Sequence, residues 1–392
     1  DYLEIAAPMS AAPSTAVVTN VRPFLPTIPM PAGIRYLILT HTAFRPQADR
    51  LAALKRAERI RAAVVDVEAA YDMFSGGVQE PQAIAAMIRH TATLSPGLQY
   101  VVLFGDDSLD PRNYLGGGNP TFVPSIMGND GSSRIPNENA YADLNGDGAP
   151  ELAIGRLPVT TLAEAVAVVD KIETQSATLA ASGSVHVFVS DDSRERDIHF
   201  GDSAREMSEK LPSTATSILA DVGGGIGTAR SAMFGAWQTG TTITHYFGHG
   251  GPEIWTDEAL FSADDVPDLP AAMSPMVLLA WACQSQYYQN YYGPSVNEAL
   301  FLAPATGALA SFGPVGISSP AHQRMVYERV YERLYAEGLS LGEIIRQAKV
   351  EALAADPLNQ DAVDGFMFFG DPSLKLPQPR PLGRPGPRFP RP

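Results

Sequence analysis

Short, almost uninterrupted apolar runs alternate with longer amphipathic stretches from residue 34 onward. The run at 34–41 (IRYLILTH) predicts a buried strand, and the proline-opened stretch at 46–62 predicts an amphipathic helix. The alternation continues with strands at 63–70, 100–106 and 151–158, and with helices around 83–90 and over 161–175. This order of elements is typical of a small α/β unit.

A second series of strands begins after the spacer at 177–184. We predict strands at 185–192, 217–222, 241–249, 275–283, 307–314 and 365–371, and a helix at 322–338. Near-continuous apolar strands separated by helices indicate a mostly parallel sheet that is covered on both faces. We therefore predict an α/β protein with two units, at 34–180 and at 181–376.

The two ends of the chain lack this pattern. Residues 1–33 are rich in Pro, Ala and Thr and have no helical period, so we expect a linker or the remnant of a preceding domain. The chain begins at Asp1 without a methionine, so we expect a trimmed piece of something longer. Residues 377–392 hold seven prolines and four arginines, which predicts an extended, flexible tail.

Charge and hydropathy argue against nucleic-acid binding and against a membrane-spanning segment. The 392 residues contain 28 Lys and Arg against 43 Asp and Glu, a formal net charge of −15. This balance argues against nucleic acid as a partner, because phosphates bind Lys and Arg. The longest uncharged run, 269–297, is broken by prolines and rich in Gln, Tyr and Asn, so we predict no membrane span.

The one cysteine of the chain is the first candidate for chemistry. A single cysteine excludes an intramolecular disulfide framework and a cysteine-ligated zinc cluster. Cys283 ends one predicted strand, and His249, followed by Gly250 and Gly251, ends another, 34 residues earlier. If these strands are neighbours, the imidazole and the thiol meet at the carboxyl ends of the sheet, where function collects in open α/β folds.

A histidine beside a cysteine supplies what thiol chemistry needs. The thiolate is the nucleophile, and a nearby imidazole takes the proton and later gives it to a leaving amine. The backbone N–H groups of Gly250 and Cys283 could form an oxyanion hole. The alternatives are that Cys283 is a small core residue and that His249 caps a strand at a turn.

An acidic loop at 143–151 (DLNGDGAPE) resembles the opening of a calcium-binding loop. Asp143, Asn145 and Asp147 occupy alternate positions before Gly148. The glutamate expected at loop position twelve is replaced by Ile154, so the segment is not an EF-hand. Two interpretations stay open: a metal-free turn, or structural calcium bound with Glu151 or other oxygens.

Six segments, taken in order, resemble the gingipain-type cysteine peptidases, which belong to the clan with the caspase-like fold. They are IRYLILTH, YVVLFGDDSLDP, DLNGDGAPELAIGRLPVTTLAEA, HYFGHGG, LLAWACQS and FMFFGDPSL, and together they span about 34–376. The resemblance implies a caspase-like α/β/α sandwich with two stacked subdomains. It also implies a cysteine endopeptidase that acts on protein or peptide substrates and needs no cofactor for its chemistry.

The resemblance assigns the catalytic residues position by position. His249 matches the catalytic histidine, and Cys283 matches the nucleophile. The family has an acidic residue after the first strand of the catalytic subdomain to orient the histidine. Asp192 is the candidate here and Asp191 the alternative, although the family has the longer Glu at this point.

The resemblance also implies cleavage after Arg or Lys, through an acidic residue deep in the specificity pocket. Asp197 and Asp202 are the candidates, and their alternative role is as solvent-facing helix-cap residues. Trp255 matches an aromatic residue near that pocket. The segment 311–319, with Gly316, is expected to form another wall. A buried carboxylate can bind a guanidinium through two hydrogen bonds.

The family resemblance favours a secreted or cell-surface protein. Two rival functions remain at this stage. One is a non-catalytic adhesion or scaffold module on the same fold, which has no need of a reactive thiol. The other is an intracellular regulatory protease that a partner activates, and it shares the same chemistry.

Overall fold

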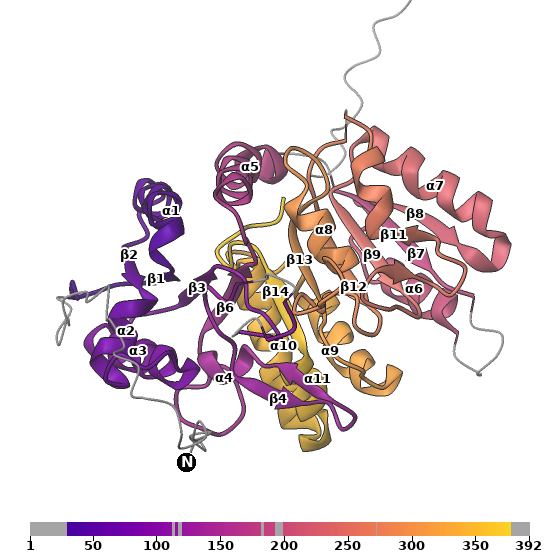
Figure 1. Ribbon diagram of the computed structural model, residues 1–392. Helices are drawn as coiled ribbons and strands as arrows, with labels where there is room; N and C mark the ends of the chain where they lie inside the picture. Colours follow the sequence, from indigo (N-terminus) through magenta and orange to yellow (C-terminus); the bar gives the residue numbers. More distant parts are fainter. Residues whose placement is uncertain are drawn as a thin grey trace, which may run out of the picture.

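The computed structural model describes residues 30–111, 114–116, 120–181, 184–192, 199–271 and 273–377 of the 392-residue chain. The predicted linker, except for its last four residues, and nearly all of the predicted tail lie outside these ranges. Within the described part, one ten-stranded sheet crosses the molecule in the order β2-β1-β3-β6-β14-β13-β12-β9-β7-β8 (Figure 1).

The strands of this sheet fall into two groups that run in opposite directions. The first group, all parallel, is β1 (Tyr36–Thr40), β2 (Ala62–Asp66), β3 (Tyr100–Phe104), β6 (Ala153–Leu157) and β14 (Phe366–Phe369). The second is β7 (Val185–Ser190), β8 (Thr216–Asp221), β9 (Ile243–Phe247), β12 (Met276–Trp281) and β13 (Ala308–Pro314). Only the pairing of β13 with β14 is antiparallel among these neighbours. The predicted mostly parallel sheet is confirmed.

The last strand of the chain joins the two predicted units. β14 pairs with β6 of the first unit on one side and with β13 of the second unit on the other. The two units therefore lie side by side along one sheet, as Figure 1 shows, and they share a core at their boundary. The domain boundary at 180 stays a prediction.

Alternate residues of the first-unit strands face opposite helical layers. Tyr36, Ile38 and Val102 pack in one core cluster with α1 and α5, whereas Leu37 and Leu39 pack in another with α2 and α3. This period of two is the reason why both faces need helices. The helices of this unit are α1 (Arg45–Ala57), α2 (Val67–Phe74), α3 (Pro81–Leu94), α4 (Asn139–Ala142) and α5 (Leu162–Ala181).

The second unit repeats the arrangement. Phe188 and Phe247 belong to the cluster that contains α6 and α9, and Val187 and Tyr246 belong to the cluster that contains α7 and α8. Both faces of the strands that end in the candidate residues are therefore buried. The helices are α6 (Phe200–Glu209), α7 (Ile226–Thr239), α8 (Val296–Leu302), α9 (Pro320–Arg333), α10 (Leu341–Ala355) and α11 (Gln360–Gly365).

Short elements complete the described chain. They are the hairpin strands β4 (Met127–Asn129) and β5 (Arg134–Pro136), the pair β10 (Ile254–Trp255) and β11 (Phe261–Ser262), and the 3₁₀ turns η1 (Thr42–Phe44), η2 (Val222–Gly224), η3 (Ala263–Asp268) and η4 (Pro357–Asn359). The strand predicted over 63–70 is too long. It ends at Asp66, whose carboxylate accepts the N–H of Glu68 and starts α2.

Candidate active site

The two candidate catalytic residues follow neighbouring parallel strands. Phe247 of β9 is paired with Trp281 of β12, and these are the last residues of the two strands. His249 and Cys283 each lie two residues further along the chain, and both side chains are half-buried. The structure therefore brings them to the same edge of the sheet, as the sequence predicts for adjacent strands.

Glycine at position 250 lets the two loops touch. A Cβ atom on Gly250 would lie 2.9 Å from the carbonyl oxygen of Cys283 and 3.0 Å from the Cβ of Ala282. Real Cβ atoms essentially never come closer than 3.0 Å to another heavy atom. The backbone beside His249 thus packs directly on the backbone of Cys283.

The thiol of Cys283 is partly buried, and the negative charge of Asp130 acts on it. Its Sγ donates to the carbonyl oxygen of Ser318 at 3.8 Å. Burial raises the pKa of the Cys283 thiol, and the charge of Asp130 raises it further. The next residue, Gln284, has a left-handed backbone with φ of 52°, which is uncommon for a residue other than glycine. A thiol of this kind needs a base to become a nucleophile.

The ring of His249 is positioned by packing. It contacts the ring of Phe200 from α6 edge-on, with centroids 5.1 Å apart. The backbone N–H of His249 donates to Asp191 at 3.0 Å. Within the described residues, no hydrogen bond joins the His249 ring to the Cys283 thiol or to a carboxylate. The structure thus holds the imidazole next to the cysteine loop without closing a hydrogen-bonded dyad.

The two aspartates that follow β7 have different surroundings. The carboxylate of Asp191 accepts the N–H groups of His249 and Asp192, and its own N–H donates to Phe247. Burial raises the pKa of Asp191, against the effect of these two N–H groups. Asp191 therefore holds the backbone of His249. Asp192 and Asp191 both border a hollow of about 180 Å³ between the ends of β7 and β8.

The remaining predicted substrate residues lie in three different settings. Asp202 is exposed in the first turn of α6 and borders the same hollow, while Asp197 falls outside the described residues. The ring of Trp255 is fully buried and stacks on the ring of Tyr246, with centroids 4.5 Å apart. It therefore packs beneath the loop of His249 as part of the core. Gly316 is buried, and its carbonyl accepts the N–H of Gln284 at 3.0 Å.

The hairpin of β4 and β5 brings a residue that the sequence reasoning missed. Asp130 lies at its tip and accepts the N–H of Ile317 at 2.8 Å, beside the cysteine loop. The dipeptide Asp130–Gly131, after Asn129, is a turn signal. It predicts a hairpin but not the surface to which the hairpin docks.

The acidic side chains of the loop at 143–151 lie close together. Carboxylate oxygens of Asp143, Asp147 and Glu151 all lie within 4.8 Å of one another. Asn145, which was also predicted as a ligand, donates its side-chain N–H groups to Asp147 and Glu151. The N–H groups of Gly146 and Gly148 bind Asp143. These hard oxygen donors have the chemistry that calcium prefers.

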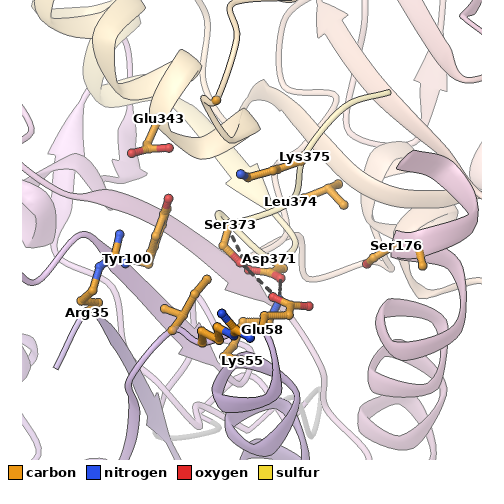
Figure 2. Close-up of a pocket in the computed structure, with 14 residues that line it drawn as sticks. Arg35, Lys55, Glu58, Tyr100, Ser176, Glu343, Asp371, Ser373, Leu374 and Lys375 are labelled. Atoms are coloured by element: carbon orange, nitrogen blue, oxygen red, sulfur yellow. Dashed lines mark hydrogen bonds and ion pairs between the residues drawn. The ribbon is translucent and has the colours of Figure 1, made fainter. Parts of the chain in front are cut away.

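A larger cavity than the hollow beside Asp192 lies elsewhere. It has a volume of about 690 Å³ and is bordered by Lys55 of α1, Tyr100 of β3 and the segment from Asp371 to Lys375. Neither Cys283 nor His249 lines it. Figure 2 shows Lys55 and Asp371 bonded to each other at one wall and Glu343 on another.

Comparison with known proteins identifies this chain. A mostly parallel α/β sheet with a cysteine and a histidine after neighbouring strands is the arrangement expected of a cysteine hydrolase with a caspase-like fold. The family model of peptidase family C25, the gingipain family, matches residues 30–377, so the chain belongs to that family and is a cysteine-type peptidase. No curated protein sequence matches it.

Solved structures agree with the fold. The complex of the pro- and mature domains of RgpB from Porphyromonas gingivalis superposes with a TM-score of 0.71 at 16% identity, covering 87% of this chain and 79% of that one. The Arg-specific cysteine proteinase gingipain R (RgpB) gives a TM-score of 0.70 at 16% identity, with 88% and 78% covered. The predicted caspase-like fold is thereby confirmed. No helix of the described residues has the length and apolar character needed to cross a membrane.

Proposed function

We propose that this chain is a cysteine endopeptidase that uses Cys283 as its nucleophile and His249 as its general base and acid. The observation that carries the proposal is the contact of Gly250 with the backbone of Cys283 at the ends of β9 and β12. That contact puts the imidazole and the thiol on touching loops. The family supplies the reaction class, peptide-bond hydrolysis.

The reaction proceeds in two stages. In the first, His249 accepts the thiol proton while Sγ attacks the scissile carbonyl carbon, and the N–H groups of Gly250 and Cys283 stabilise the oxyanion. The imidazolium then gives that proton to the leaving amine, and a thioester remains. In the second, water gives a proton to His249 and attacks the thioester. The carboxylic acid leaves, and the proton returns to Cys283.

Asp191 and Asp192 have separate parts in this proposal. Asp191 binds the backbone N–H of His249 and so fixes the loop that carries the imidazole. Asp192 is the residue that we propose to orient the ring during the reaction.

We further propose cleavage after Arg or Lys, with Asp202 or Asp197 binding the basic side chain and Gly316 forming part of the wall. Two observations support this: Asp202 shares a hollow with Asp192, and a solved relative is described as Arg-specific. Trp255 serves by supporting the loop of Gly250, because its ring is fully buried. Export from the cell and a structural calcium ion at Asp143, Asn145, Asp147 and Glu151 are parts of the same proposal.

The test uses the fact that the chain has one cysteine. We expect Cys283→Ala to abolish hydrolysis of a random peptide library, and His249→Ala to reduce kcat by at least about a thousandfold. A peptidyl chloromethyl ketone should label only Cys283, and slowly after His249→Ala. His90→Ala, on α3, is the matched control and should keep wild-type activity.

Two results of this test decide between the functions. Hydrolysis by Cys283→Ala would refute the thiol mechanism, and a wild type that neither cleaves nor reacts with the probe would favour the scaffold module. Products of the wild type that show no Arg or Lys before the cleaved bond would refute the basic specificity alone. With that specificity present, Asp197→Ala and Asp202→Ala identify the residue that reads it.

A further inference from the structure

The hairpin of β4 and β5 reaches from the first unit of the fold to the wall of the candidate active site. At its tip, Asp130 uses Oδ1 to accept the N–H groups of Ser132 and Ser133, at 2.8 and 2.7 Å. Its Oδ2 accepts the N–H of Ile317 at 2.8 Å, a bond between residues 187 positions apart. A single carboxylate thus ties the hairpin to the segment that follows β13.

That segment is also in direct contact with the nucleophile. The carbonyl oxygen of Ser318 accepts from the thiol of Cys283 at 3.8 Å, and Gln323 holds the same oxygen at 3.1 Å. The carbonyl oxygen of Gly316 accepts the N–H of Gln284 at 3.0 Å. A shift of residues 316–318 would therefore move the groups that hold the thiol and the residue after it.

The fit between hairpin and wall depends on a missing side chain. A Cβ atom on Gly316 would lie 2.8 Å from Oδ2 of Asp130 and 3.1 Å from two carbons of Ile135 in β5. Glycine at this point lets the carboxylate approach the backbone closely. This close packing argues that the hairpin has one defined position against the wall.

Asp130 also brings a negative charge to the thiol. Partial burial acts to raise its pKa, but the N–H groups of Ile317, Ser133 and Ser132 outweigh this and hold the pKa of Asp130 below its usual value. The carboxylate is therefore ionised wherever the thiol titrates. Its charge raises the pKa of Cys283, after the larger effect of burial.

We propose that Asp130 is a positioning residue of the peptidase reaction: it fixes the wall at 316–318, which holds the thiol of Cys283 and the residue after it. The first unit thereby completes the active site of the second. This inference rests on the proposed role of Cys283 as nucleophile. It explains why a residue outside the catalytic unit is bonded to the backbone beside the thiol.

The other titratable groups of the candidate site come from two further loops. They are His249 after β9, and Asp191 and Asp192 after β7. Asp191 is bonded to the backbone of His249. Among the described groups, Asp130 is the carboxylate whose charge acts on the thiol. Removing that charge should therefore be visible in the titration of Cys283.

The experiment compares Asp130→Asn and Asp130→Ala with the full wild-type chain. The pH dependence of iodoacetamide alkylation reports Cys283 alone, because it is the only cysteine. For Asp130→Asn we expect the alkylation profile to move to lower pH, because removal of a negative charge that raises the pKa of the thiol lowers that pKa. For Asp130→Ala we expect the same shift together with a roughly tenfold or larger loss of kcat/KM, since Asn keeps one acceptor oxygen that can still bind the N–H of Ile317, whereas Ala keeps none.

Asp356→Asn is the matched control. Asp356 is a half-buried aspartate that accepts the backbone N–H of Leu358 at 3.0 Å, after α10. We expect this variant to retain the wild-type alkylation profile and kcat/KM. A merely structural role for Asp130 would lower the thermal stability of Asp130→Ala and leave the Asp130→Asn profile in place.

The outcomes separate this inference from the proposed function. If Cys283→Ala is inactive and both Asp130 variants match the control in profile and in kcat/KM, the positioning role is refuted and the nucleophile stands. If Cys283→Ala keeps its activity, the proposed function fails, whatever the Asp130 variants do. If Asp130→Ala does not fold, the alkylation profile of Asp130→Asn decides the question.

Discussion

At position 250, only glycine fits the close contact with the backbone of Cys283. In Gly250→Ala, the new Cβ would lie 2.9 Å from the carbonyl oxygen of Cys283, so one of the two loops must move. A displacement of the order of 1 Å in an active site costs about a hundredfold in rate. We expect kcat/KM of Gly250→Ala to fall by about that factor, as measured with a peptide that the wild type cleaves.

Gly251, the next residue, is a suitable control because it has room for a side chain. A Cβ on Gly251 would have only Ile254 nearby, at 3.9 Å, which is an ordinary contact. Gly251→Ala should therefore stay within about threefold of wild-type kcat/KM, because it adds the same methyl group one residue further along. Equal losses in the two variants would show that the loop needs glycine for its flexibility and not for the contact with Cys283.

At the scale of elements, the acidic loop before β6 is the segment that an ion would change most. Asp143, Asp147 and Glu151 bring three like charges within 4.8 Å of one another, and a cation bound between them would reduce their repulsion. Added calcium should raise the midpoint of thermal unfolding, because a ligand that binds only the folded state stabilises it by about 2.7 kcal/mol at a hundred times its Kd.

Differential scanning calorimetry with calcium, magnesium and EDTA measures that effect. Asp143→Asn keeps an oxygen acceptor for Gly146 and should lose most of the calcium-dependent rise. Asp110→Asn is the control, since Asp110 accepts the N–H of Tyr114 in a different loop. A midpoint that calcium leaves unchanged in the wild type would mean that the loop is a metal-free turn.

Most elements could be predicted, because most strands of the main sheet are mainly apolar, whereas β8 (TSILAD) also has polar residues. His249 and Cys283 could be predicted as partners because periodicity places both at strand ends. The position of Asp130 could not, since its bond to Ile317 spans 187 residues and depends on how β14 joins the two units. The bond of Asp191 to a backbone N–H was equally hidden, because composition does not reveal where a carboxylate points.

At the scale of the whole molecule, a buried ion pair joins the two units. Lys55 of α1 lies 2.6 Å from Asp371, which follows β14, and both side chains are 3% exposed. The hydroxyl of Tyr36 also donates to Asp371. Removing the ammonium leaves the buried carboxylate of Asp371 without an opposite charge, so Lys55→Met should lower the free energy of unfolding by about 3–5 kcal/mol.

Denaturation in urea measures this loss, and Arg45→Met is the matched control. Arg45 pairs with Asp49 on the surface of the same helix, where such a pair contributes about 1 kcal/mol or less. Similar losses in the two variants would show that the buried pair does not hold the units together.

The same pair predicts how acid destabilises the molecule. Burial acts to raise the pKa of Asp371, but the Lys55 ammonium and the hydrogen bonds of Tyr36 and Ser373 outweigh it, and the pKa lies below its usual value. A carboxylate with a lowered folded pKa stabilises the protein fully above its unfolded pKa, about 3.9, and this contribution is lost as the pH falls through the folded pKa. Wild-type stability should therefore fall in that range, and less steeply in the double variant Lys55→Met/Asp371→Leu. Equal slopes in urea titrations from pH 5 downward would assign the acid sensitivity to other carboxylates, because the double variant has no Asp371 left to protonate.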